Sequence, residues 1–292
     1  MNLFTNEKAG TACFIYEAGC ICGKNALVAK ERKDRSNMSM KKIVASVVSQ
    51  KQIGSDVFDM ILNVGDVAAM ARPGQFISMY SNDKSKLLPR PISICGINAE
   101  EGTLRVVYRA VGEGTKEFSQ MVPGQTLDVI GPLGNGFTMK DKKAILFGGG
   151  IGIPPMLELA KQLNCDSTAV LGYRDEIFLA DEFEAVTKVA IASEDGKTGT
   201  KGNVLDAVRE QNLDAEIIYA CGPMPMLKAI KAWAEEKGIE CQVSLEERMA
   251  CGIGACLACV CKSTEVDHHT HVHNKRICKD GPVFDAKEVV FE

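Results

Sequence analysis

The sequence predicts an α/β chain with an added β part: an antiparallel β-barrel, then a doubly wound parallel sheet, then a small cysteine-rich C-terminal domain. Three observations predict this order. Residues 40–140 form short runs of alternating apolar and polar side chains. Residues 141–243 alternate strand and helix patterns, and residues 244–292 hold closely spaced cysteines.

The predicted barrel is built from short strands separated by turn signals. Glycine and proline mark the turns, as in Arg72-Pro73-Gly74. Strands are expected at 43–48, 57–62, 75–80 and 104–109. Many short strands with such punctuation are typical of a small antiparallel barrel.

The middle domain opens with a buried strand at 144–147, a glycine-rich run at 148–155 and a helix through Leu163. Further strands are expected at 167–171, 189–192 and 216–220, and helices near 204–211 and 224–237. This alternation predicts a parallel sheet with helices on both faces.

The C-terminal domain has three cysteines at C-x4-C-x2-C spacing and a fourth downstream: Cys251, Cys256, Cys259 and Cys278. This is the ligand pattern of a plant-type [2Fe–2S] cluster, which needs four converging thiolates. Gly252 and Gly254 allow the loop to turn tightly. A structural zinc site is the alternative, but such sites usually use two separated C-x2-C pairs. Here three cysteines share one short loop, so the cluster is the prediction.

Composition indicates the cellular compartment and excludes some classes of partner. Twelve cysteines without a signal peptide indicate metal ligands rather than disulfides, and we expect a cytoplasmic protein. No apolar run approaches a membrane span, so no membrane partner is predicted. The net charge of −4 gives no reason to propose a nucleic-acid partner.

Residues 1–39 differ from the rest because they show no sustained period. Their three cysteines match no closed metal site. We interpret them as an N-terminal extension or as the product of a misassigned start, since Met38 and Met40 directly precede the first predicted strand.

Two motifs in the barrel region suit a phosphate-bearing cofactor. Arg90-Pro91-Ile92-Ser93 follows a predicted strand, and its guanidinium can bind a phosphate through two hydrogen bonds. Gly114 and Thr115 precede a short predicted helix at 116–121, with Thr115 as the expected N-cap. A helix N-terminus favours a pyrophosphate. Taken alone, the R-P-x-S motif is equally well explained as a surface turn.

The nucleotide motifs of the middle domain lie at the carboxyl edge of the predicted sheet. The run Gly148-Gly149-Gly150-Ile151-Gly152 joins strand to helix, where a dinucleotide phosphate docks in such folds. It departs from G-x-G-x-x-G, and a tight turn is the structural alternative. Cys221-Gly222-Pro223 ends a later strand at the same edge. Asp175 and Glu176 favour NAD, whereas Arg174 favours NADP.

The order of these motifs resembles the ferredoxin–NADP reductase superfamily: R-P-x-S at 90–93, G-G-G-x-G-x-x-P at 148–155 and C-G-P at 221–223. The run E-R-M-A-C-G-I-G-A-C-L-A-C-V-C at 247–261 and C-K-D-G-P-V-F at 278–284 resemble its iron–sulfur branch, the electron-transfer subunits of type B dihydroorotate dehydrogenase. The resemblance covers residues 41–292.

This resemblance implies an FAD-binding barrel, an NAD-binding sheet domain and a [2Fe–2S] domain. FAD would be held by Arg90, Pro91, Ile92, Ser93, Val107, Tyr108, Arg109, Gly114 and Thr115. The nicotinamide nucleotide would lie against Gly148, Gly149, Gly150, Gly152, Cys221, Gly222 and Pro223. The cluster would be ligated by Cys251, Cys256, Cys259 and Cys278. No residue of this chain is expected to act as a catalytic acid or base.

The implied function is electron transfer in pyrimidine biosynthesis. An FMN-containing catalytic partner would oxidise dihydroorotate to orotate, and electrons would pass through cluster and FAD to NAD+. Flavin belongs in the middle because it handles both one and two electrons. The resemblance also implies a heterotetramer with two copies of each chain.

Two other functions compete with this one. Small subunits of ferredoxin-dependent NAD(P)H reductases and sulfide dehydrogenases typically carry Asp at the first ligand position and a C-G-x-C ending. Cys251 and the run Cys256-Leu257-Ala258-Cys259 argue against them. A non-catalytic iron–sulfur sensor is the other alternative, against which the flavin and nucleotide motifs argue.

Two features fall outside the pattern. All four histidines lie at 268–273; an exposed hairpin is the prediction and a metal site the alternative. Cys261 would point the same way as Cys259 in a strand leaving the loop, and we interpret it as a bystander thiol.

Overall fold

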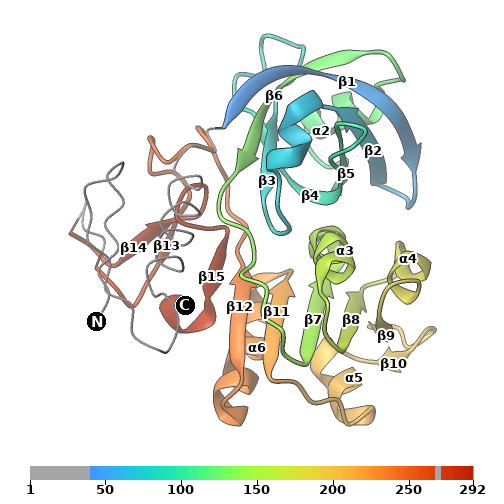
Figure 1. The fold of residues 1–292 in the computed structure, drawn as a ribbon, viewed down its shortest axis with the longest axis vertical. Helices are drawn as coiled ribbons and strands as arrows, with labels where there is room; N and C mark the ends of the chain where they lie inside the picture. Colours follow the sequence, from blue (N-terminus) through green and yellow to red (C-terminus); the bar gives the residue numbers. More distant parts are fainter. Residues whose placement is uncertain (1–39, 267–270, 292) are drawn as a thin grey trace, which may run out of the picture. The chain divides into compact units, whose positions relative to one another are not determined.

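An antiparallel barrel forms the N-terminal part of the computed structural model, which describes residues 40–266 and 271–291 (Figure 1). Its strands close in the order β1-β2-β5-β4-β3-β6. The strands are β1 (Lys41–Gln52), β2 (Val57–Asn63), β3 (Phe76–Met79), β4 (Arg90–Asn98), β5 (Thr103–Arg109) and β6 (Thr126–Leu133), with a 3-10 turn η1 (Gly65–Met70) after β2. The predicted barrel is confirmed. The N-terminal extension, 1–39, lies outside the described residues.

The Arg90–Ser93 motif follows β3 after the loop at 80–89 and itself begins β4, a strand that the sequence pattern did not predict. Pro91 is tolerated because β5 pairs with β4 only from Ile94 onward, so no ladder hydrogen bond is lost there. The helix expected at 116–121 is α2 (Glu113–Ser119) and begins earlier. Thr115 is not its N-cap: its Oγ1 accepts from the Gly112 N–H at 3.1 Å, so the residue closes the first turn from within.

The nucleotide domain is a sheet ordered β10-β9-β8-β7-β11-β12-β15, parallel except for β15. Its elements are β7 (Ala144–Gly149), η2 (Gly150–Gly152), α3 (Ile153–Gln162), β8 (Ser167–Tyr173), α4 (Ala180–Glu184), β9 (Lys188–Ser193), β10 (Thr200–Lys201), α5 (Val204–Glu210), β11 (Ile217–Cys221), α6 (Met224–Lys237) and β12 (Glu240–Ser244). Every residue of β7 is buried, as expected for a strand covered on both sides.

Two apolar cores cover the two faces of this sheet. One includes side chains of α3 and α4, and the other includes those of α5 and α6. The prediction of a doubly wound sheet is therefore confirmed. In Figure 1, α3 lies at the junction between sheet and barrel. None of the helices in the described part of the chain is long and apolar enough to cross a membrane.

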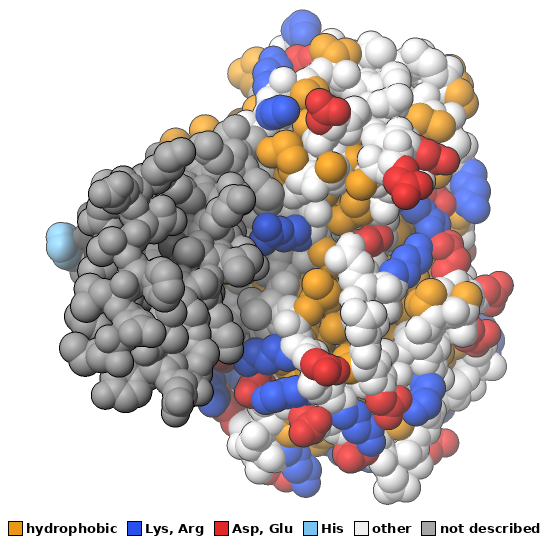
Figure 2. Space-filling model, viewed as in Figure 1, with side chains coloured by type: hydrophobic (Ala, Val, Ile, Leu, Met, Phe, Trp, Pro, Cys, Tyr) orange, Lys and Arg blue, Asp and Glu red, His pale blue; other side chains and the backbone are white. Residues whose placement is uncertain are grey.

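The C-terminal segment is anchored on the nucleotide sheet. Its hairpin, β13 (Val260–Lys262) and β14 (Asn274–Arg276), follows the cysteine loop. The next strand, β15 (Val283–Asp285), pairs antiparallel with β12, beside which it lies in Figure 1, and a short turn, η3 (Ala286–Glu288), follows. The expected boundary near residue 243 thus falls inside β12. On the face shown in Figure 2, acidic and basic side chains are interspersed over the nucleotide domain.

Ion pairs hold the barrel against the nucleotide domain. Arg105 on β5 bonds Asp59 on β2 through Nε–Oδ1 at 2.8 Å and Nη2–Oδ2 at 2.9 Å. The same guanidinium reaches Glu182 on α4 through Nη2–Oε1 at 2.8 Å. Farther along this junction, the buried Glu158 of α3 accepts the Ile97 N–H at 3.0 Å.

Candidate functional site

A cavity of about 300 Å³ opens where the barrel, the glycine turn and the end of β12 meet. Predicted flavin residues form one wall: Arg90, Pro91, Ile92, Ser93, Val107, Tyr108, Arg109 and Thr115. The opposite wall is formed by Ile151 of the glycine turn and by Ser244–Glu247 and Met249. The cavity thus brings together sequence segments from all three predicted domains.

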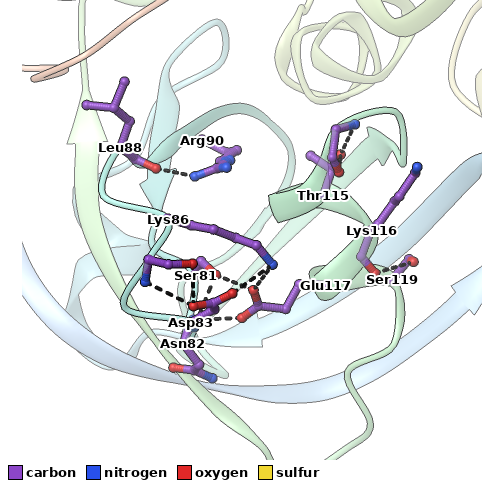
Figure 3. A network of polar contacts seen from close by, with 12 residues as sticks. Ser81, Asn82, Asp83, Lys86, Leu88, Arg90, Thr115, Lys116, Glu117 and Ser119 are labelled. Carbon is purple, nitrogen blue, oxygen red and sulfur yellow. Dashed lines mark hydrogen bonds and ion pairs between the residues drawn. The ribbon is translucent and has the colours of Figure 1, made fainter.

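The phosphate end of this cavity is organised around Arg90. Its Nη1 donates to the Leu88 carbonyl, and the guanidinium lies against the first turn of α2 (Figure 3). A Cβ at Gly114 would overlap that guanidinium, so only glycine allows this approach. Gly114 itself does not line the cavity; it makes room for the cation that does. A guanidinium placed here is suited to a pyrophosphate.

The loop that carries Leu88 is tied to α2 by a polar network (Figure 3). Lys86 Nζ contacts Glu117 Oε2 at 3.1 Å, and the Asn82 N–H donates to Glu117 Oε1 at 2.7 Å. Burial acts to raise the pKa of Glu117, but hydrogen bonds from Ser81 and Lys86 bring it below its ordinary value. The network anchors the loop whose Leu88 carbonyl accepts a hydrogen bond from Arg90. Sequence reasoning missed it because a charged turn looks like ordinary solvated surface.

Two predicted flavin residues have other engagements. The Tyr108 ring is packed in the barrel core, and its hydroxyl donates to Gln50 Oε1 at 3.0 Å. Burial raises the pKa of this phenol. Arg109 pairs with Asp56 at 3.5 Å near the surface. Both residues border the cavity, but the Tyr108 hydroxyl is already bonded away from it.

Glu246 is a cavity residue that sequence reasoning missed. It follows β12 and lines the cavity. Its side chain is exposed in the open cavity, yet the neighbouring protein atoms desolvate the carboxyl enough to raise its pKa. The same carboxylate acts on the buried Cys221 thiol, whose pKa is raised by burial first and by Glu246 second. The available signal was an acidic residue at the carboxyl edge of the sheet, directly before the cysteine loop.

The two nucleotide turns are in contact. A Cβ at Gly149 would stand 3.0 Å from Pro223 Cδ, and one at Gly152 would stand 2.5 Å from the Cys221 carbonyl carbon. The end of β7 and the end of β11 are neighbours in the sheet, which places both turns at one edge. Gly148, Gly150 and Gly222 complete the predicted nucleotide set at this edge. Their role in binding stays a prediction.

The four cysteines of the C-terminal domain lie in two pairs, three of them from the loop at 251–259 and Cys278 from the segment after β14. The Cys278 N–H approaches Cys259 Sγ at 3.4 Å, and the Cys256 side chain hydrogen-bonds Cys251. The Gly254 N–H donates to Cys278 Sγ at 3.1 Å, which ties the loop to Cys278. Among the described residues, no three metal-binding side chains surround a single point. Two pairs of sulfurs are instead what two irons with two thiolates each require.

Backbone donors favour the charged form of one of these thiols. Burial acts to raise the pKa of Cys251, but N–H groups of Ile253 and Cys256 lower it to about 6. Burial and the neighbouring Cys259 raise the pKa of Cys278 to about 12. The loop turns at Gly252 and Gly254 with φ of 69° and 83°, as expected from the sequence. The donor set fits a [2Fe–2S] cluster.

Cys261 and the histidine tract are the two remaining sequence features. Cys261 lies in β13 opposite Lys275, and burial raises its pKa to about 11. Its role as a bystander stays a prediction. His268 and His269 lie outside the described residues, whereas His271 and His273 are exposed.

Known proteins share this chain's fold and cysteine domain. Residues 246–290 match the family described as the iron–sulfur cluster binding domain of dihydroorotate dehydrogenase B. The dihydroorotate dehydrogenase B (NAD(+)) electron transfer subunit of Caldanaerobacter subterraneus subsp. tengcongensis is 42% identical over 252 residues, covering 86% of this chain and 99% of that protein. The protein of the same name from Geobacillus sp. (strain WCH70) is 44% identical over 263 residues, covering 86% and 99%.

Solved structures point to the same fold. A chain of the NADH-dependent reduced ferredoxin-NADP oxidoreductase is 32% identical with a TM-score of 0.77, covering 85% of this chain and 90% of that one. A ferredoxin NADP+ reductase from Neisseria gonorrhoeae with bound FAD and NADP is 16% identical with a TM-score of 0.56, covering 68% and 92%. The second likeness bears on the fold alone.

Proposed function

This chain belongs to the family of dihydroorotate dehydrogenase B electron transfer subunits, and we propose that it carries electrons from an FMN-containing catalytic partner to NAD+ in pyrimidine biosynthesis. The observation that carries the proposal is the shared cavity. Its flavin wall faces the Ser244–Met249 segment, and that segment runs directly into Cys251. This arrangement supports neighbouring sites for flavin, nucleotide and cluster.

The chemistry of the bound groups explains why the sites adjoin: FAD exchanges two electrons with the nicotinamide and single electrons with [2Fe–2S]. The protein's part is to bind and orient. Arg90, held by the Leu88 carbonyl, would neutralise the flavin pyrophosphate, and Ser93 would lie near the flavin ring. The paired thiols Cys251/Cys256 and Cys259/Cys278 would each hold one iron.

We assign NAD rather than NADP on the acidic residues after β8. Glu176 is engaged with the barrel, since its carboxylate accepts the Ser55 N–H at 2.7 Å. Asp175 is exposed beside it and would meet a ribose 2′-hydroxyl. We expect a catalytic-efficiency ratio of NADH over NADPH well above one. The substitution Asp175→Ala should lower that ratio.

The proposed function requires a catalytic partner subunit. Dihydroorotate oxidation would take place on the FMN-containing subunit, in a cytoplasmic heterotetramer of two copies of each chain. Size-exclusion chromatography with light scattering on the co-expressed pair tests this stoichiometry. Alone, this chain should oxidise NADH with an artificial dye but should not turn over dihydroorotate.

The proposed transfer of electrons through the cluster is tested with Cys256→Ser. The variant should keep NADH oxidation by a dye that accepts electrons from flavin, yet lose dihydroorotate-dependent reduction of NAD+ with its partner. Coupled turnover by cluster-free protein would refute the proposal. The 32% identical ferredoxin-linked structure marks the rival function. Reduction of a ferredoxin, with no partner supporting dihydroorotate oxidation, would favour that rival.

A further inference from the structure

Ser78 on β3 is a buried hydroxyl without a hydrogen-bond partner. Its side-chain oxygen is the one buried side-chain polar atom in the described residues for which no partner is found. The residue is only 1% exposed. Buried hydroxyls are normally bonded, because an unpaired one loses the hydrogen bonds it made with water. An unpaired hydroxyl buried in the barrel wall therefore suggests that a bound group supplies its hydrogen-bond partner.

The direction of Ser78 is set by the alternation of β3. Ile77 and Met79 point into the barrel core. Phe76 and Ser78 therefore point outward, because successive side chains of a strand alternate. Phe76 lines the flavin cavity and belongs to the same apolar core as Cys259 and Cys278. Ser78 thus lies on the barrel face that is covered by the cysteine loop.

The neighbour of Ser78 across this face is Gly252, the residue after Cys251. A Cβ at Gly252 would stand 2.8 Å from Ser78 Oγ and 3.6 Å from Leu133 Cδ1. Gly252 is itself buried, with φ of 69°. The glycine removes a side chain that would otherwise fill the space in front of the hydroxyl. The backbone of the cysteine loop can therefore approach the hydroxyl closely.

We propose that Ser78 donates a hydrogen bond to a sulfur of the bound [2Fe–2S] cluster and thereby raises its reduction potential. This inference rests on the proposed function. Hydrogen bonds to cluster sulfurs stabilise the more negative, reduced state, so they shift the potential upward. Ser78 is a tuning residue on the barrel face that the cysteine loop covers. It would bias the transfer of each electron without touching substrate.

The test is an EPR-monitored redox titration of the full chain with its cofactors. In Ser78→Ala the reduction potential of the cluster should fall by about 28 to 59 mV, which corresponds to a roughly three- to tenfold change in the one-electron equilibrium. The matched control is Ser263→Ala, because Ser263 is also buried but its hydroxyl already donates to the Glu265 carbonyl at 2.6 Å. That variant should keep the wild-type potential.

A wild-type potential in Ser78→Ala with full iron content overturns the assignment. Should Ser78→Ala fail to hold the cluster, Ser78→Cys decides, since its thiol has similar size but is a weak donor. A bound cluster with a lowered potential supports the proposal, whereas a wild-type potential or loss of the cluster in both variants overturns it. Absence of [2Fe–2S] signal from the wild-type protein would instead refute the proposed function.

Discussion

Replacing Gly152 by alanine should separate the two nucleotide turns. Gly152 ends η2, and a Cβ there would stand 2.5 Å from both the carbon and the oxygen of the Cys221 carbonyl and 2.6 Å from the Gly222 nitrogen. Ordinary contact begins near 3.4 Å, so the backbones must part by about 0.9 Å. Backbone on both sides leaves no flexible side chain to yield. Overpacking of this kind costs about 1–3 kcal/mol.

The assay is NADH oxidation by a dye on FAD-loaded protein, together with thermal unfolding. If the whole of this cost weakens NADH binding, KM for NADH should rise roughly 5- to 150-fold, because about 1.4 kcal/mol corresponds to each tenfold change. Flavin content should not change, because the flavin wall lies on the barrel. Gly238→Ala is the control: its φ of 67° makes alanine strained, but its Cβ meets nothing within 4 Å. It should lower Tm and leave KM alone. An unchanged KM and Tm in Gly152→Ala would refute the reasoning.

Three further substitutions test other parts of the site. Cys278→Ser should bleach the cluster absorbance while FAD stays bound, and Cys261→Ser should leave it intact; the reverse pattern would show that the fourth ligand is misassigned. Arg90→Ala should weaken FAD binding roughly tenfold to hundredfold, since a charge-assisted contact contributes about 1.5–3 kcal/mol; flavin titration of the apoprotein measures it, and unchanged affinity removes Arg90 from the site. Glu246→Gln should raise Tm at pH 8 but not at pH 4. The raised pKa of this carboxyl favours folding below its unfolded value, and the advantage is lost as pH rises through the folded pKa. Equal Tm differences at both pH values would contradict it.

Local pattern predicted the elements well where packing agrees with it. The expected helix at 224–237 is α6 with the same bounds, because proline at its second position and Gly238 at its end mark both termini. The whole of β4 was missed, because R-P reads as a turn until β3 supplies its pairing partner. The strands β6 and β12 were not predicted either, and neither were the short strands β10, β13, β14 and β15. Each of these four short strands pairs over only two or three residues, so tertiary contact rather than sequence pattern defines it.

The candidate site shows the same division between local and tertiary information. Cysteine spacing alone predicted four sulfurs that the structure brings together in pairs. Glu246 and Ser78 carry no motif, and their interest arises only from what folds against them. Ser78 becomes notable because Gly252, far along the chain, leaves its hydroxyl facing the loop. Local spacing and periodicity cannot predict residues whose role depends on a neighbour far along the chain.

The junction between barrel and sheet explains how one chain can hold its cofactor sites in register. Arg105 binds two carboxylates at once, Asp59 of the barrel and Glu182 of α4, and its Nη2 donates to both. The flavin wall belongs to the barrel and the nucleotide turns belong to the sheet, so their separation depends on this junction. The cysteine loop is likewise fixed to both, through β15 on the sheet and through Ser78 and Leu133 on the barrel. Sites placed on rigid elements keep their geometry better than sites on loops. Because the loop is clamped from both sides, the flavin and cluster sites would hold a constant spacing while the nucleotide enters and leaves.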